Sequence, residues 1–120
     1  MAKTATDPGY AACPIRNIVD RFGDKWSLLV LYNLHTGGRL RFSEIHRRMT
    51  DISQKMLAST LRRLEQDGLL SRTVYPEVPP RVEYTLTKTG YSLKPILDSM
   101  VVWGTHYKQQ NAAQEERHDS

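Results

Sequence analysis

The segment from Ser53 to Asp67 sorts its residues by helical face, and this pattern constrains the fold more than any other feature of the chain. At about 100° per residue, four apolar residues and one threonine gather on one side: Met56, Leu57, Thr60, Leu61 and Leu64. The opposite side is polar: Lys55, Ser59, Arg62 and Gln66. No carboxylate lies at the centre of this polar stripe. The pattern predicts a helix with one face in a core and another face that suits a polyanion.

A second, shorter helix is expected just before this one. Ser43 can cap its start, Glu44 lies favourably near its positive end, and the helix runs through Met49. Residues 50–52 then make a turn, and Ser53 caps the longer helix. The spacing is that of a helix-turn-helix, in which the first helix braces the second.

Two β-rich runs follow Gly68, where the longer helix ends. Residues 69–74 and 82–86 are expected to be strands, the second by clean alternation of apolar and polar residues. Arg72 interrupts the alternation in the first strand, which leaves the register of that strand open. The loop 75–81 contains three prolines, which suit a projecting hairpin tip. The whole order predicts an α+β fold, the winged helix-turn-helix.

Two further helices are expected upstream of this unit. The first spans residues 14–22, with apolar residues at helical spacing, and ends at Gly23. Asp24 can cap the second helix, whose apolar residues surround most of its circumference: Trp26, Leu28, Leu29, Val30, Leu31 and Leu34. We expect this second helix to be the buried centre of the domain, closed by Gly37 and Gly38.

Thr87 opens a long predicted helix that carries two apolar stripes. The first stripe repeats every three or four residues: Ile96, Met100, Trp103 and Tyr107. The second stripe is Leu93, Leu97 and Val101. Two stripes on a terminal helix indicate a partner. Residues 1–11 and 109–120 are polar and are expected to be flexible tails, which leaves one domain over residues 12–108.

The distribution of charge favours a nucleic-acid partner for the central segment. The chain has 17 lysines and arginines against 13 acidic residues. Between Arg39 and Arg72 there are eight basic and four acidic residues, so this segment alone accounts for the net charge of +4. A surplus confined to one segment is expected of a nucleic-acid footprint.

Several other classes of protein and site are not expected. The chain has no run of eighteen apolar residues and no hydrophobic signal region at its N-terminus, which predicts a cytoplasmic protein without a membrane segment. Its single cysteine, Cys13, excludes an intramolecular disulfide. The four histidines show no metal-binding spacing, so neither a metal nor a cofactor is expected. No pair of nucleophile and base stands out, so the chain is not predicted to be an enzyme.

Four stretches, in this order, resemble the HxlR-type winged helix-turn-helix regulators, which are relatives of the MarR group: CPIRNIVDRFGDKWSLLVLYNL, RFSEIHRRM, ISQKMLASTLRRLEQDGLLSR and PPRVEYTLTKTGYSLKPILDSM. The resemblance extends over roughly residues 13–107. It implies a homodimeric transcription factor, most commonly a repressor, that binds a pseudo-palindromic operator in double-stranded DNA. It also implies that helices near both ends of the chain build the dimer. Some family members sense electrophiles or oxidants through an N-terminal cysteine, a role implied here for Cys13.

Nine residues are predicted to contact DNA: Arg41, Ser43, Ser53, Gln54, Lys55, Ser59, Arg62, Arg63 and Arg81. Gln54 and Lys55 are best placed for base edges, and Ser53 suits a phosphate at the helix N-terminus. The two arginines further along the helix suit contacts with the DNA backbone. Arg81, on the wing, is expected at the minor groove or its phosphates.

Residues near both ends of the chain are predicted to serve sensing and assembly. Cys13 precedes Pro14 at the start of a helix, with Arg16 three residues on, and both features favour the reactive thiolate. An inert, packed cysteine is the alternative. The predicted dimer interface comprises Ile15, Ile18, Ile96, Met100, Trp103 and Tyr107. An effector pocket between the dimer helices is a further hypothesis for four aromatic residues: Trp26, Tyr91, Trp103 and Tyr107.

Two other interpretations remain open from the residues alone. A winged helix can serve as a protein-interaction module, in which the basic stripe meets an acidic partner instead of DNA. Specific binding to a duplex separates that interpretation from a regulator. The second alternative is an enzyme with Cys13 as a thiol nucleophile, and turnover under excess substrate would reveal it.

Overall fold

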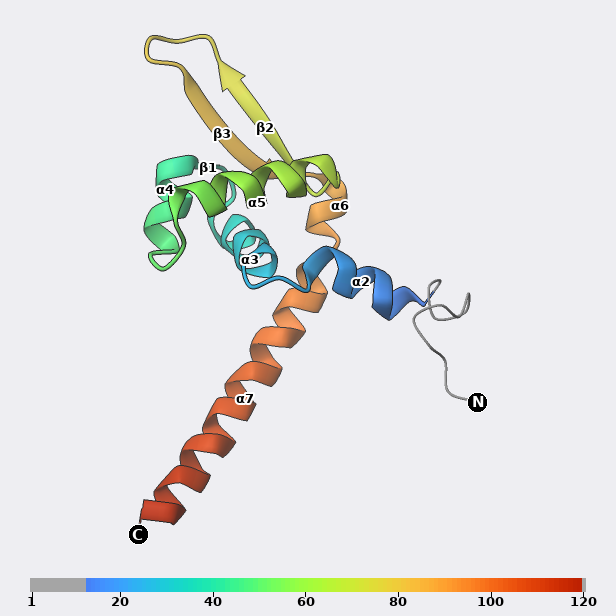
Figure 1. The fold of residues 1–120 in the computed structure, drawn as a ribbon, viewed down its shortest axis with the longest axis vertical. Helices are drawn as coiled ribbons and strands as arrows, with labels where there is room; N and C mark the ends of the chain where they lie inside the picture. The colour runs from blue at the N-terminus through green and yellow to red at the C-terminus, as the bar shows by residue number, and fades with distance from the viewer. Residues whose placement is uncertain (1–12, 120) are drawn as a thin grey trace.

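The computed structural model describes the backbone of residues 13–119 and the side chains of residues 13–112. Its elements are, in order, α2 (Pro14–Phe22), α3 (Ser27–Gly37), β1 (Leu40–Arg41), α4 (Phe42–Arg48), α5 (Gln54–Gln66), β2 (Leu70–Tyr75), β3 (Arg81–Leu86), α6 (Lys88–Tyr91) and α7 (Lys94–Asp119). In Figure 1 the β2–β3 hairpin projects from one side of a helical body, and α7 leaves on the other side. This is the expected α+β winged helix-turn-helix, with an additional N-terminal helix and a long C-terminal helix.

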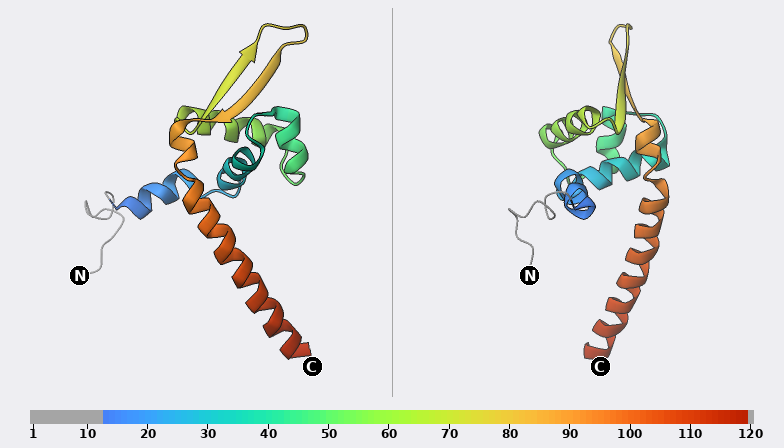
Figure 2. Two further views of the ribbon diagram at one scale, coloured as in Figure 1. Left: turned by 180° about the vertical axis from the view of Figure 1, so that it is seen from behind. Right: turned by 90° about the vertical axis from the view of Figure 1, so that its right-hand side faces the viewer.

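A three-stranded antiparallel sheet in the order β1-β3-β2 joins the hairpin to the body. β2 and β3 pair from Leu70 opposite Leu86 to Tyr75 opposite Arg81. The first of these pairs is buried in the core, whereas Val74, nearer the tip, is 49% exposed. The outer half of the hairpin therefore stands away from the core, as both views in Figure 2 show.

The hydrophobic core lies between α3, α4, α5 and the base of the hairpin. α5 contributes Leu57, Leu61 and Leu64, all at most 1% exposed, which confirms the predicted apolar face of this helix. Fully burying one such side chain stabilises the fold by about 1.5–3 kcal/mol. Met56, placed on the same face by the helical period, is instead 44% exposed because it lies at the margin of the stripe.

The structure covers α3 on fewer sides than its composition suggests. Val30, Leu31 and Leu34 are completely buried, as predicted. Leu29, however, is 44% exposed, and Tyr32 lies on the surface. Apolar residues on all sides of a helix indicate that other elements must pack around it. They do not show whether all of these elements come from the same chain.

The start of α4 differs from the prediction, whereas both ends of α5 confirm it. β1 runs directly into α4, so Arg41 occupies the position before the helix and Ser43 lies inside its first turn. The backbone N–H of Arg41 donates to Glu44 Oε1 at 2.9 Å. At the start of α5, Ser53 Oγ accepts from the backbone N–H of Met56 at 3.0 Å. The helix ends before Gly68, whose φ of 77° favours glycine.

The long helix predicted from Thr87 is broken into two. Thr87 Oγ1 accepts from the backbone N–H of Gly90 at 3.1 Å and caps the short helix α6. The chain then turns at residues 92–93 before α7 begins. Pro95 explains the break, because proline has no N–H to donate and its ring would collide with the carbonyl of Tyr91 in a continuous helix.

Residues 109–119 continue α7, although the sequence predicts a flexible tail from residue 109 onward. Glutamine, alanine, glutamate and arginine dominate this stretch, and all four are good helix formers. No glycine or proline follows Gly104 to end the helix. The predicted N-terminal tail, residues 1–11, lies outside the described residues. Within the described part of the chain, no helix is both long and apolar enough to span a membrane.

Candidate nucleic-acid interface

The exposed face of α5 presents cations that have no partner within the protein. Lys55 and Arg62 are exposed, and their side chains form no ion pair or hydrogen bond with any described residue. The first turn of α5 contains no acidic residue, so the positive end of the helix dipole is also uncompensated. This face therefore has the charge that binding to a polyanion requires.

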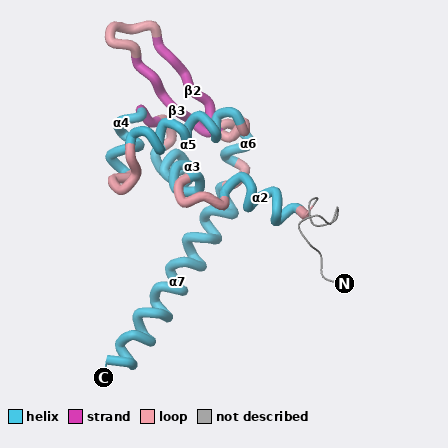
Figure 3. Tube along the Cα trace, in the orientation of Figure 1, coloured by secondary structure: helices cyan, strands magenta, loops and turns pink. Residues whose placement is uncertain are grey.

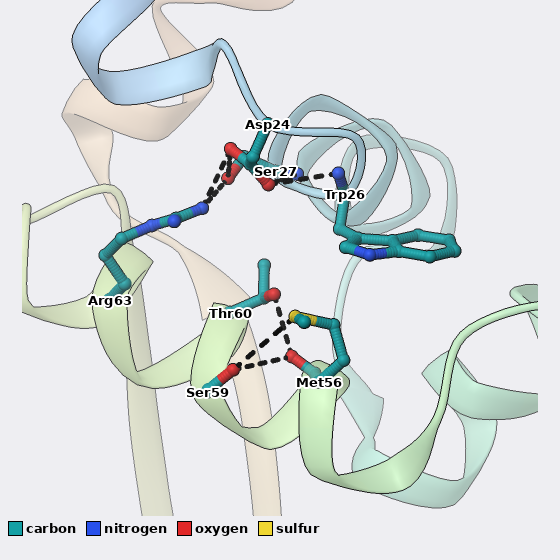
Figure 4. Close-up of polar contacts among 7 residues, drawn as sticks. All are labelled: Asp24, Trp26, Ser27, Met56, Ser59, Thr60 and Arg63. Atoms are coloured by element: carbon teal, nitrogen blue, oxygen red, sulfur yellow. Dashed lines mark hydrogen bonds and ion pairs between the residues drawn. The ribbon is translucent and has the colours of Figure 1, made fainter.

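Arg63, one position further along, is engaged elsewhere. Figure 4 shows its side chain extending from α5 to the corner between α2 and α3. There Arg63 Nη2 lies 2.9 Å from Asp24 Oδ1, and the same group donates to Ser27 Oγ. The prediction grouped Arg63 with the phosphate contacts, but in this structure it fastens α5 to the α2–α3 corner.

Asp24 holds this corner together. Its carboxylate accepts from the backbone N–H groups of Trp26 and Ser27 at 3.0 and 2.9 Å, so it caps α3 as predicted. The Ser27 hydroxyl also donates to it at 2.6 Å. Burial raises the pKa of Asp24, but the hydrogen bonds from Ser27, Trp26 and Arg63 outweigh that effect and lower the pKa from 3.8 to about 2. The carboxylate is therefore ionised throughout the neutral range.

A second ion pair ties α2 to the end of α5. Arg21 Nη1 donates to Asp67 Oδ1 at 2.9 Å. Asp67 directly follows α5 and Arg21 lies in the last turn of α2. Together with the contact between Arg63 and Asp24, this pair joins the C-terminal end of α5 to α2 and to the α2–α3 corner.

Arg81 of the wing is neutralised by carboxylates of the same hairpin. Arg81 begins β3 and lies 3.3 Å from both Glu77 and Glu83, with its guanidinium over the ring of Tyr75 at 4.2 Å. Arg39 also pairs with Glu83, at 3.4 Å, and donates to the Tyr75 hydroxyl at 2.6 Å. The predicted wing contact, Arg81, is thus paired in the free protein.

A cleft between α5 and the hairpin contains residues that the sequence prediction missed. It is lined by Phe42, Ala58, Arg62, Glu65, Arg72 and Tyr84. Arg72 lies directly opposite Tyr84 in the ladder, so it is on the same face of the sheet as Leu70 and Leu86. Arg72 interrupts the apolar alternation for this reason: it occupies an inward position of the strand, beyond the edge of the core. A charged residue at an inward position is the signal by which the sequence could have identified it.

The remaining predicted DNA contacts lie near the start of α4 and α5. Arg41 and Ser43 are exposed at the start of α4, and the Ser43 carbonyl accepts from Arg47 Nε at 3.4 Å. Gln54 is exposed in the first turn of α5, and the Ser59 hydroxyl donates to the Met56 carbonyl at 3.0 Å. These side chains are therefore exposed on the surface of the protein.

The residues predicted to form the dimer are all exposed in the single chain: Ile15, Ile18, Ile96, Met100, Trp103 and Tyr107. Figure 3 shows α2 and α7 leaving the body as separate helices. Trp103 and Tyr107 stack on each other along α7, with ring centroids 5.1 Å apart. Tyr91 instead meets the ring of His35, and Trp26 packs against the core, so the four aromatic residues of the hypothetical effector pocket lie in three different places.

Cys13 occupies the position before α2 and is partly buried. It lines a shallow depression with Ile15, Arg16, Val19 and Asp20. Arg16 Nε lies 3.9 Å from Asp20 Oδ2. Cys13 is therefore placed at the start of α2, as expected. Among the residues that the structure describes, no three His, Cys, Asp or Glu side chains are grouped to hold a metal ion.

Comparison with known proteins gives consistent matches along most of the chain. Residues 21–112 match the model of the HxlR-like helix-turn-helix family. An HTH-type transcriptional regulator of Methanothermobacter thermautotrophicus is 51% identical, over 87% of this chain and 88% of that protein. The redox regulator HypR in its oxidized form has a TM-score of 0.73 at 42% identity, covering 78% of this chain and 96% of that one. Reduced YodB, a transcriptional regulator of B. subtilis, has a TM-score of 0.67 at 39% identity, covering 76% and 89%.

These matches agree with the helix-turn-helix, the hairpin and the cationic face of α5. They favour a regulator over a protein-interaction module, because the relatives are transcriptional regulators along nearly their whole length. The family is one of regulators and not a class of enzymes. The chain belongs to the HxlR-like helix-turn-helix family and is a DNA-binding transcriptional regulator.

Proposed function

We propose that the protein acts as a homodimer that inserts one α5 from each protomer into successive major grooves of a pseudo-palindromic operator. The observation that supports this proposal best is the exposed face of α5, where Lys55 and Arg62 have no partner among the described residues. Gln54 and Lys55 are assigned to base edges, and Ser53 to a phosphate at the helix N-terminus. Arg41, Ser43 and Ser59 are assigned to the flanking backbone.

Exposed apolar residues on α2 and α7 support the dimer. Trp103 is 68% exposed, Ile15 66% and Ile96 55%, and soluble monomers rarely leave a large contiguous apolar patch uncovered. A second copy of the chain can cover both helices across a two-fold axis. Two α5 helices related by that axis fit half-sites about 34 Å apart, which predicts an imperfect inverted repeat.

The dimer is tested by Met100→Asp, which places a charge in the middle of the exposed stripe of α7. Met100 is 48% exposed in the single chain, so the substitution is compatible with the fold of the protomer. Sedimentation equilibrium should then show a monomer with weakened operator binding. A dimer that persists with Met100→Asp would move the interface elsewhere.

Repression by occlusion of the polymerase site is the proposed outcome of operator binding. A protein with this function acts in the cytoplasm of a bacterium or an archaeon, where the chromosome lies.

Fluorescence anisotropy with a duplex from upstream of the protein's own gene, compared with a scrambled duplex, tests operator binding. Binding at least about a hundredfold tighter to the first duplex is expected. Equal and weak binding to both would remove that region as the operator.

Lys55→Gln gives the corresponding test of the surface. It should weaken binding to both duplexes and reduce discrimination between them, because Lys55 is assigned to base edges. Lys108→Gln removes the same charge from α7, far from α5, and should leave binding unchanged (Figure 1). Equal weakening with both variants would mean that net charge, and not the surface of α5, governs binding.

Sensing of an oxidant or electrophile through Cys13 is the proposed regulation. Structures of similar proteins include a redox regulator in its oxidized form and YodB after treatment with diamide. Because the chain has one cysteine, any disulfide that it forms must be to a second protomer or to a separate thiol. The ion pair from Arg21 to Asp67 connects α2, which follows Cys13, with the end of α5, and the pair from Asp24 to Arg63 connects the α2–α3 corner with α5.

Treatment with diamide, with and without added glutathione, tests this regulation. Wild-type protein should form a covalent dimer or a glutathione adduct with altered operator affinity, and reduction should reverse both changes. Cys13→Ser should show neither change. Unaltered affinity of the fully oxidised wild type would show that oxidation of Cys13 does not regulate DNA binding.

A further inference from the structure

The cleft between α5 and the hairpin has the composition of an anion site. Two arginines line it from different elements, Arg62 from α5 and Arg72 from β2. Neither guanidinium forms an ion pair or a hydrogen bond with any described residue. Three other arginines of this region form ion pairs: Arg39 just before β1, Arg81 on the hairpin and Arg63 on α5. The cleft thus gathers two cations that the protein itself leaves unpaired.

The orientation of Arg72 follows from the strand register. Arg72 pairs with Tyr84, and Leu70 pairs with Leu86 two residues away. Since residues at intervals of two share a face, Arg72 lies on the face of the sheet that packs on α5. Tyr84 and Phe42 also line the cleft, and its volume of about 350 Å³ leaves room for a phosphate group.

The position of this cleft relates it to DNA. When the face of α5 that bears Lys55 enters a major groove and the hairpin approaches the adjacent minor groove, one phosphate strand must pass between helix and hairpin. That strand crosses the cleft. Figure 2 shows the hairpin rising beside α5.

We propose that Arg72 is a further DNA-binding residue, which clamps with Arg62 a backbone phosphate of the strand that runs between the recognition helix and the wing. The guanidinium groups match phosphate oxygens in geometry and charge. The sequence-predicted contacts do not include Arg72, and the inference rests on the proposed use of α5.

Glu65 provides an independent test of the proposal, because its removal should change DNA affinity in the direction opposite to removal of Arg72. Glu65 lines the same cleft, and its carboxylate pairs with no cation among the described residues. A negative charge beside a bound phosphate opposes binding. Removing this charge should therefore strengthen binding, while removing the charge of Arg72 should weaken it.

The test uses the full chain and two duplexes of equal length, one from upstream of the protein's own gene and one of random sequence, at several salt concentrations. Arg72→Gln should weaken binding to both by a similar factor of about three to ten, because a phosphate contact is independent of sequence. The slope of log K against log salt should fall by about 0.9 for each phosphate that the variant no longer neutralises. Glu65→Gln should strengthen binding to both about twofold or more. Lys108→Gln is the matched charge control and should change neither quantity.

The other outcomes separate this inference from the proposed interface. Unchanged affinity and slope with Arg72→Gln, while Lys55→Gln weakens binding, would overturn the phosphate clamp and leave α5 as the recognition helix. Unchanged affinity with both variants would overturn the interface itself. Weakening confined to the native duplex at an unchanged salt slope would overturn the clamp and make Arg72 a base-reading residue. Circular dichroism of each variant establishes that the fold is retained.

Discussion

The two halves of α5 are built for different tasks, although they form one continuous helix. In the N-terminal half, Gln54 and Lys55 are exposed, and their side chains have no partner among the described residues. At the C-terminal end, Arg63 is held by Asp24 and the adjoining Asp67 is held by Arg21. The helix is therefore anchored to the body at one end and presents unoccupied polar groups at the other.

This difference teaches how a small domain keeps its recognition helix in place without using the residues that read DNA. The ion pairs join α5 to segments about forty residues away in the sequence. Anchoring at the C-terminal end leaves the N-terminal end, with its positive helix dipole, free to approach the groove. Substitutions of Arg63 and of Lys55 should thus separate effects on stability from effects on DNA binding.

The largest expected effect is on the free energy of unfolding, from substitutions on the buried side of α5. The two halves of the helix should not differ there. Leu57 and Leu64, one in each half, are both completely buried. Replacing either with alanine should lower the free energy of unfolding by about 2–5 kcal/mol. The variant loses the free energy of transferring the removed methyl groups from water to the core, and the cavity that remains adds a further cost. Urea denaturation measures both variants. A much smaller decrease for one of them would show that the core, too, is unequal along α5.

Asp24→Ala should produce the next largest effect, a decrease of about 1–2 kcal/mol in the free energy of unfolding. The substitution removes the cap of α3 and the anchor of Arg63 together. A double-mutant cycle with Arg63→Gln isolates the contact between α5 and the corner. Additive effects would show that this contact does not contribute to anchoring.

The stability of the corner should also depend on pH. The pKa of Asp24 is lowered from 3.8 to about 2 in the folded protein, so the folded state favours the ionised carboxylate. The resulting stabilisation, about 1–2 kcal/mol after screening at this partly exposed site, is fully present above about pH 5 and is lost as the pH falls toward 2. The difference in unfolding free energy between wild type and Asp24→Ala should therefore be roughly halved near pH 3. A difference that is constant from about pH 6 to about pH 3 would contradict the low pKa.

Arg63→Gln and Lys55→Gln compare the exposed sides of the two halves directly. Each removes one positive charge from α5. Arg63→Gln should lower the free energy of unfolding by about 1 kcal/mol, because Asp24 loses its partner. Lys55→Gln should leave the unfolding free energy unchanged and weaken DNA binding several-fold. If both variants weakened DNA binding equally at unchanged stability, Arg63 would be a DNA contact, as the sequence alone suggests.

The smallest effect is expected for the second anchor. Arg21 is 63% exposed at its side chain, so its pair with Asp67 is well solvated. Arg21→Gln should lower the free energy of unfolding by less than about 1 kcal/mol. Hydrogen exchange of the last turn of α5 gives a more sensitive readout, because local opening of that turn should become more frequent. Unchanged exchange would restrict the anchoring to Asp24 and Arg63.

Much of the helix-turn-helix is predictable from local sequence. The apolar face of α5, its cap at Ser53 and its end before Gly68 all agree with the structure. The prediction was wrong where a distant element intervened. Pairing of β1 with β3 starts α4 before Ser43, and the exposure of Leu29 depends on which sides of α3 other elements cover.

The candidate interface was predictable only in its central residues. The exposure of Gln54, Lys55, Ser59 and Arg62 follows from the helical period. The ion pairs of Arg81 with Glu77 and Glu83 depend on strand register, and so does the position of Arg72 in the cleft. A register shift of one residue moves every side chain to the other face, so an uncertain register leaves the wing undetermined.

The sequence by itself determined the order of the helix-turn-helix and the hairpin, the sorted faces of α5 and the caps at Asp24 and Ser53, because periodicity and capping act over a few residues. The tertiary structure alone decided which cations stay available to a partner. Arg62 and Arg63 are neighbours in the chain, but one step along a helix turns the side chain by about 100°. Arg63 consequently reaches Asp24 at the α2–α3 corner, while Arg62 faces the cleft that Arg72 completes.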